Sequence, residues 1–97
     1  MPTYVTLANW TDQGIRNVKD APKRAAAFEN AVQAAGGKVK EMYLVMGEYD
    51  LIVVTEAPND EAVARLALAT GMIGNVRTRT LRAFNREEMT KIISSLP

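Results

Sequence analysis

The chain has 97 residues, 47% of them hydrophobic, with 12 basic and 11 acidic side chains and a net charge of +1. This length gives room for one domain, residues 1–97, and the balanced charge gives no electrostatic footprint for nucleic acid or an anionic membrane. The chain contains no cysteine and no histidine, which excludes disulfides, zinc sites built on thiolate or imidazole, cysteine nucleophiles and histidine-based triads.

The first third of the sequence predicts a strand, a loop and a helix. Residues 3–9 are β-branched, aromatic and apolar, as is typical of a strand. Residues 10–19 are expected to form a polar loop that holds the only tryptophan. A helix is predicted from about Asp20, with proline in its first turn and Gly36-Gly37 at its end. Its apolar residues recur at helical spacing: Ala25, Phe28, Val32 and Ala35.

The middle of the chain predicts a β-hairpin. An apolar run over residues 39–46 is followed by the most β-prone run of the chain, over residues 51–55, and strands are predicted over about 39–46 and 49–56. Between the two lies the corner Gly47-Glu48-Tyr49-Asp50, and a short connection that contains glycine is typical of a hairpin. We expect this hairpin to lie in the middle of the sheet.

The last third predicts a helix, a strand and a terminal helix. Pro58 ends the preceding strand, residues 59–61 offer a cap and acidic side chains for a helix that runs to about Thr70, and glycines follow it. A strand is predicted over residues 76–84. Residues 85–88 resemble a capping box, and the helix after it carries apolar residues at helical spacing: Met89, Ile92, Ile93 and Leu96.

The order βαββαβ with a terminal helix predicts a ferredoxin-like α+β fold, in which two helices cover one face of a four-stranded antiparallel sheet. Both faces of the two hairpin strands are apolar: Met42 and Leu44 alternate with Tyr43 and Val45 in the first of them. A face left to water would be polar. We therefore expect a second copy of the chain to cover the other face, as a homodimer or a higher oligomer.

The chain resembles the GYD-domain family over nearly its whole length. The extra residue Glu48 interrupts the Gly-Tyr-Asp signature, and the other matching segments surround it. The matching residues are Trp10 to Gly14, Lys23-Arg24, Gly36 to Val39, Tyr43, Met46 to Asp50, Glu56 to Glu61, Gly74 to Thr78 and Arg82 to Phe84. The resemblance implies the dimeric α+β barrel superfamily, in which two ferredoxin-like sheets pack face to face.

The chain is also similar, more distantly, to the ligand-binding domains of the leucine-responsive regulator family. The similarity is carried by Gly47 to Asp50 before a β run and by Gly74 to Thr80 at the start of the last strand, with an offset of one residue at the threonines. In that family such domains bind small effectors at subunit interfaces. The chain has no attached helix-turn-helix.

Six residues are candidates for ligand binding, and each also has a structural interpretation. For Asp50 we favour a corner residue that accepts hydrogen bonds from turn N–H groups. Tyr43 and Tyr49 fit pocket walls or interface packing, and Trp10 fits a lid or a loop anchor. Arg24 and Arg77, together with Arg79 and Arg82, fit an anion site, and we favour a solvated face or inter-subunit ion pairs for them.

We predict a cytoplasmic homo-oligomer that binds a small molecule at or near the subunit interface, without metal or cofactor, nucleic acid or membrane. No apolar run approaches the about 20 residues that span a bilayer, and the first residues lack the pattern of a signal peptide. Two alternatives stay open: a cofactor-free enzyme of the barrel superfamily, an isomerase or a monooxygenase, and a purely structural assembly module.

Overall fold

A computed structural model describes all 97 residues. The four strands form one antiparallel sheet in the order β2-β3-β1-β4. This order and the βαββαβ succession confirm the predicted ferredoxin-like fold. The elements are β1 (Thr3–Trp10), α1 (Asp12–Arg16), the 3-10 turn η1 (Val18–Asp20), α2 (Ala21–Ala34), β2 (Lys38–Leu44), β3 (Leu51–Glu56), α3 (Asp60–Ile73), β4 (Val76–Ala83) and α4 (Arg86–Ser94).

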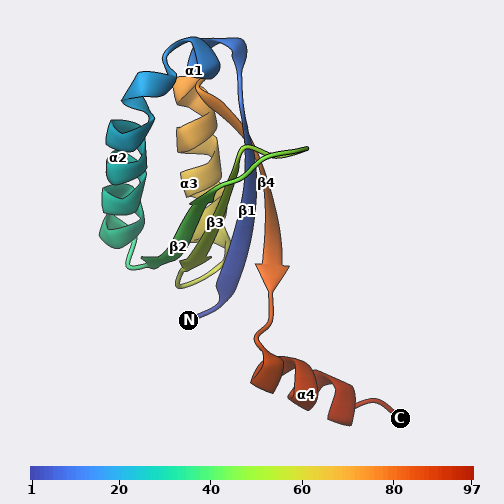
Figure 1. Cartoon of the computed structure of the whole chain (residues 1–97). Coiled ribbons are helices and arrows are strands. Elements are labelled where there is room, and N and C mark those ends of the chain that lie inside the picture. Colours follow the sequence, from blue (N-terminus) through green and yellow to red (C-terminus); the bar gives the residue numbers. More distant parts are fainter.

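The molecule has two layers, with α2 and α3 on one face of the sheet and no element on the other (Figure 1). The most buried strand residues are Tyr4, Ala8, Val53 and Thr55, which the register places on the same face of β1 and β3. These residues face the helices, because side chains alternate between the faces of a strand. The second face, called the open face below, has no fully buried residue.

The predicted helix ends are largely confirmed by local hydrogen bonds. The Asn59 side chain accepts from Ala62 N at the start of α3, and Asn85 and Glu88 form the predicted capping box of α4. Gly36 follows α2 with φ +85°, a conformation that favours glycine. Helix α3 continues past the predicted end to Ile73 and stops where Gly74 is left-handed.

The segment after β1 was expected to be a loop, but it contains α1 and η1. Thr11 caps α1 by accepting from Gly14 N, and its hydroxyl donates to the carbonyl oxygen of Gly74 at 2.5 Å. Gly14 packs against the Asn75 backbone so tightly that a Cβ there would lie 1.9 Å from the carbonyl oxygen. This short helix therefore depends on contacts with residues about 60 positions away, which local sequence patterns do not show.

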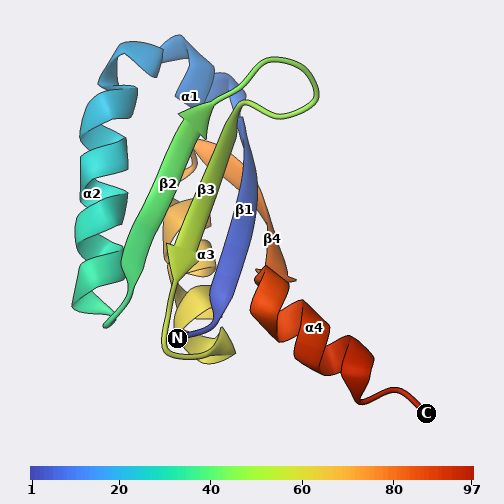
Figure 2. The same ribbon diagram turned by 60° about the horizontal axis from the view of Figure 1, so that its bottom comes forward.

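The hairpin between β2 and β3 differs from the prediction in three ways. Its strands are shorter, so Tyr49 and Asp50 belong to a loop over residues 45–50, which projects beyond the end of the sheet (Figure 2). A β-bulge lies between Val39 and Glu41 and shifts the register of β2 by one residue. The hairpin was also expected in the middle of the sheet, and this prediction is wrong: β2 and β4 are the two edge strands, and the interior strands are β3 and β1.

Helix α4 lies beyond the end of β4, away from the sheet and from α2 and α3 (Figures 1 and 2). Its apolar residues Met89, Ile92 and Ile93 are all about half exposed. The radius of gyration is 14.6 Å, compared with about 12.5 Å expected for a compact chain of this length. The chain thus presents two apolar surfaces that it does not cover itself, the open face and the stripe of α4.

Candidate functional site

Asp50 holds the corner of the hairpin loop against the end of β1. Its carboxylate accepts from Trp10 N at 2.9 Å and makes a longer contact of 3.5 Å with the Asn9 amide nitrogen. Its backbone N–H donates to the carbonyl of Ala8, and its own carbonyl accepts from Val45 N. Asp50 is thus engaged by the fold at the corner, but its carboxylate accepts from the end of β1 and not from N–H groups of the turn, as was expected.

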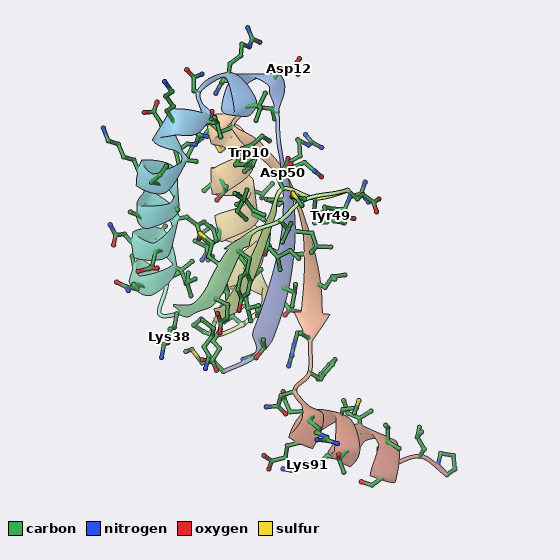
Figure 3. The ribbon with its side chains drawn as sticks, viewed as in Figure 1. Trp10, Asp12, Lys38, Tyr49, Asp50 and Lys91 are labelled. Carbon is green, nitrogen blue, oxygen red and sulfur yellow. The ribbon has the colours of Figure 1, made fainter.

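Tyr49 lies on the projecting loop and Asp50 lies at its base, as Figure 3 shows. The loop is fastened by Asn9, whose amide nitrogen donates to the Glu48 carbonyl at 2.9 Å. Gly47 at its tip has φ +113°, where a side chain would be strained. Tyr49 itself is half-buried, and it does not join the other candidate residues in a cavity.

Trp10 and Arg24 come together on the helix side of the sheet, where they line a cavity of about 110 Å³. Trp10 is the last residue of β1, and Arg24 is on α2. The Arg24 guanidinium donates to the carbonyl oxygens of Gly14 and Asn17, both at 3.2 Å. It therefore ties α2 to α1 and to Asn17, which lies between α1 and η1. The rest of the lining is mostly apolar.

Tyr43 and Arg77 lie on the open face, near opposite edges of the sheet. Tyr43 pairs with Ile52, which pairs with Leu7 in β1, and Leu7 in turn pairs with Arg79 in β4. Two residues further along β1, on the same face, Asn9 pairs with Arg77. The open face thus carries an arginine-bearing edge, a central band of valine, leucine and isoleucine, and a β2 edge with Tyr43 and Glu41.

The Tyr43 hydroxyl donates to a Glu41 carboxylate oxygen at 2.8 Å. This hydrogen bond, together with the negative charge of Glu41, raises the pKa of Tyr43 above its ordinary value of 10.0. Neither Glu41 nor Arg79 takes part in the one ion pair of the chain, which joins Lys40 to Glu56. A carboxylate and a guanidinium without an ion-pair partner therefore lie on opposite edges of the same face.

The six predicted site residues are divided among three places, because strand alternation and the longer loop separate them. Sequence reasoning weighed Arg79 only as part of a possible anion site and missed Glu41, because their positions across the open face follow only from the register. It also missed Thr55, a buried residue whose hydroxyl has no hydrogen-bond partner. A threonine on a helix-facing strand position gives no signal that its hydroxyl is unpaired.

A second polar group that the sequence did not indicate is the buried Tyr4, whose hydroxyl donates to Asp60. Burial and the bond to Asp60 raise the pKa of Tyr4. The Arg82 guanidinium lies 4.3 Å from the centre of the Phe84 ring and 5.7 Å from that of Tyr4. No group of three or more acidic, cysteine or histidine side chains could hold a metal ion, and no helix combines the length and apolarity of a membrane span.

Comparisons with known proteins agree with this architecture. The family model described as "GYD domain" matches residues 4–93. A protein of Thermus thermophilus named "Glutamine synthetase and cystathionine beta-lyase binding protein" is 34% identical over 84 residues, which cover 86% of this chain and 88% of that protein.

Solved structures with the same fold include a feast or famine regulatory protein from M. tuberculosis in complex with L-methionine. Its TM-score is 0.64 at 22% identity, over 88% of this chain and 51% of that one. The structure named FFRP-DM1 has a TM-score of 0.61 at 28% identity and is covered completely, over 87% of this chain. The chain thus spans about half the length of the full regulator and the whole of the shorter protein.

Proposed function

Because the chain belongs to the GYD domain family, we propose that it is a regulatory protein that self-associates through its open face and binds a small molecule at or near the subunit interface. The observation that carries the proposal is the apolar open face, which no helix of the chain covers (Figure 1). A sheet face exposed to water is normally polar. The likeness to a regulator that binds L-methionine is a further support.

The size of the open face fits a dimer in which α4 or the loop also takes part. Four strands about 4.8 Å apart and about 23 Å long give a face of roughly 440 Å². A stable interface buries about 800 Å² on each partner. The 45–50 loop and α4 lie beyond opposite ends of the sheet (Figure 2), and their exposed Met46, Ile92 and Ile93 would supply the remaining area.

The charges of the open face favour one of the two simple symmetric arrangements. A two-fold axis across the strands places each β4 antiparallel to its own copy, so that the exposed Arg79 near the middle of β4 meets its equivalent and repels it. An axis along the strands places β4 of one copy opposite β2 of the other. In that dimer Arg79 faces the row of Tyr43, with Glu41 adjacent.

We expect the pairing of Arg79 with Tyr43 and Glu41 of the other copy to stabilise the dimer through two kinds of contact. The guanidinium of Arg79 would lie over the Tyr43 ring of the other copy, a cation–π contact of about 0.5–1 kcal/mol at an exposed site. The free Glu41 carboxylate would be its ion-pair partner. Since both pairs recur by symmetry, the charges specify the arrangement, while the central Val5, Leu7, Ile52 and Val54 supply most of the apolar burial.

Sedimentation velocity over a micromolar concentration series tests the assembly. We expect a dimer or larger species for the wild type, a dimer weakened about tenfold or more by Arg79→Glu or by Glu41→Arg, and recovery in the double variant. Arg65→Glu on the exposed side of α3 is the control with an equal change of charge. A monomeric wild type would refute the assembly, and a double variant as weak as the single ones would refute the axis along the strands.

Ligand binding is tested separately, by native mass spectrometry of the freshly purified protein and by calorimetry with L-methionine as the first probe. Binding at the interface predicts that Tyr43→Ala or Arg77→Gln reduces the affinity at protein concentrations where the dimer persists. Unchanged affinity in both variants would place the ligand elsewhere on the molecule. If mass spectrometry detects no co-purified compound and calorimetry detects no heat of binding with L-methionine, the ligand part of the proposal fails.

A second candidate function is binding to metabolic enzymes, and the 34% identity to the Thermus thermophilus protein over most of both chains favours it. We would immobilise the chain and pass purified glutamine synthetase and cystathionine beta-lyase over it. Saturable binding that is lost on Ile92→Ser in α4 but kept in Arg65→Glu would support this function. Absence of binding at micromolar concentrations would argue against it.

For either function we propose a cytoplasmic location, which cell fractionation of a tagged chain would test.

A further inference from the structure

The cavity lined by Trp10 lies between the two layers of the molecule, at the end of the sheet where β1 finishes. All four strands and both α2 and α3 contribute to its lining, which includes the small side chains of Ala8, Ala21 and Ala25. Its volume is about 110 Å³. The interior of a folded protein is normally packed as densely as an organic crystal, with few voids larger than a water molecule. The chain therefore leaves a space here that its own side chains do not fill.

Three large apolar residues line this cavity, and the chain does not cover any of them completely. They are Trp10, Phe28 and Met42, and each is only half-buried although it lies between the sheet and the helices. Apolar surface that stays accessible to water does not contribute the free energy that its burial would provide. A guest in the cavity would remove part of this surface from water, and that burial would drive its binding.

The chemistry of the wall selects an uncharged guest. The accessible wall of the cavity is almost entirely carbon. Arg24 is the only charged residue in the lining, and its guanidinium already donates to the carbonyl oxygens of Gly14 and Asn17. A charged group inside the cavity would lose its hydration without gaining a free counter-charge. The part of a ligand that enters must therefore be neutral and apolar.

We infer that this cavity is a binding site for an uncharged molecule with an unbranched apolar chain of about four carbons. A dry cavity of about 150 Å³ holds benzene, which corresponds to about 25 Å³ for each carbon, so a cavity of about 110 Å³ has room for about four. The site lies on the helix side of the sheet, opposite the open face (Figure 1). It is therefore independent of the proposed self-association and of a ligand at the interface.

Straight-chain alcohols test the site, because they differ only in the length of the apolar chain and their hydroxyl can stay in water. Trp10 is the only tryptophan, so its fluorescence emission reports on the cavity. From ethanol to 1-butanol we expect a saturable change of the Trp10 emission, with an affinity that rises about fourfold for each added methylene. Beyond about five carbons the gain should stop, because further methylenes find no room in the cavity.

Substitutions in the wall separate the site from a general effect of alcohols. Ala25→Leu places a larger side chain in the cavity and should lower the affinity for 1-butanol about tenfold or more, whereas Ala26→Leu, at an exposed position of the same helix, should leave it unchanged. Met42→Ala enlarges the cavity, so the gain in affinity should continue to chains about two carbons longer. If Ala25→Leu does not fold, Ala25→Val provides a smaller filling with the same expected direction.

Four results would overturn the inference: no saturable response of Trp10 to 1-butanol, an affinity that keeps rising to 1-octanol in the wild type, equal affinities in Ala25→Leu and Ala26→Leu, or the same limiting chain length in Met42→Ala and the wild type. The sedimentation coefficient of each sample separates these outcomes from failure of the proposed function. A monomeric protein that still binds 1-butanol would refute the assembly alone. A dimer without a response to 1-butanol would refute the cavity site alone.

Discussion

The corner made by Asp50 gives the sharpest test of how the hairpin loop is held. In Asp50→Ala the Trp10 N–H loses its carboxylate acceptor at 2.9 Å. A hydrogen bond to a charged group contributes about 1.5–3 kcal/mol. The backbone bonds of Asp50 to Ala8 and Val45 remain possible, so the loop stays partly fastened. We therefore expect the free energy of unfolding to fall by about 2 kcal/mol.

Urea denaturation at one fixed protein concentration, followed by far-ultraviolet circular dichroism and by Trp10 fluorescence, measures this change. For a domain of this size, about 2 kcal/mol corresponds to a melting temperature lower by roughly 10 °C. Asp50→Asn keeps an oxygen acceptor but not the charge, so about half of the loss is expected. The dependence of the unfolding free energy on urea should stay unchanged.

Glu48→Ala is the matched control, because Glu48 lies in the same loop and its exposed side chain makes no hydrogen bond. Its effect should stay within about 0.5 kcal/mol. Two results would refute the reasoning. The first is an Asp50→Ala variant as stable as the wild type, and the second is an equal loss in both variants, which would indicate that the net charge of the loop matters and not the bond to Trp10.

The remaining predictions concern other contacts of the fold. Gly14→Ala should lower the free energy of unfolding in urea by about 3 kcal/mol or more, because its Cβ would lie 1.9 Å from the Asn75 carbonyl oxygen. Gly71→Ala should raise the free energy of unfolding by about 0.5–1 kcal/mol, since the space around this position in α3 is empty. The pKa of Tyr4 is raised, chiefly by burial. The contribution of the neutral Tyr4 side chain to the free energy of unfolding is therefore fully present below pH 10 and is lost as the pH rises through the native pKa. Urea denaturation from pH 9 to 11 should show this loss. The Tyr4→Phe variant, which cannot ionise at this position, should show a smaller loss. Ile92→Ser should weaken self-association in sedimentation velocity with little change in the circular dichroism spectrum, because α4 is exposed within one chain; an unchanged dimer would exclude α4 from the interface.

Much of the fold could be predicted because its signals are local. The alternation of the strands, the asparagine caps of α3 and α4, and the glycine after α2 each act over a few residues. The short helix α1 could not be predicted, since Gly14 and Thr11 acquire their roles only against Asn75 and Gly74. The bulge in β2 could not be predicted either, because a register shift depends on the residues of the neighbouring strand.

The candidate site was less predictable because it depends on which residues meet across strands and layers. Trp10 and Arg24 were chosen from separate segments, and they do line one cavity. Tyr43 and Arg77 lie on the opposite face, and Tyr49 lies on the projecting loop (Figure 3). The cavity is lined in part by the small side chains of Ala8, Ala21 and Ala25, and a run of alanines in a helix does not indicate what lies opposite.

The β-bulge in β2 has a consequence for how copies of this chain avoid forming fibrils. An exposed edge strand offers free N–H and C=O groups to any other strand, and a bulge or a lysine on that edge opposes such pairing. In β2 the irregular register between Val39 and Glu41 coincides with the exposed Lys38 and Lys40. The edge of the sheet thus discourages open-ended strand addition, while the apolar open face remains available for an association that closes after one partner.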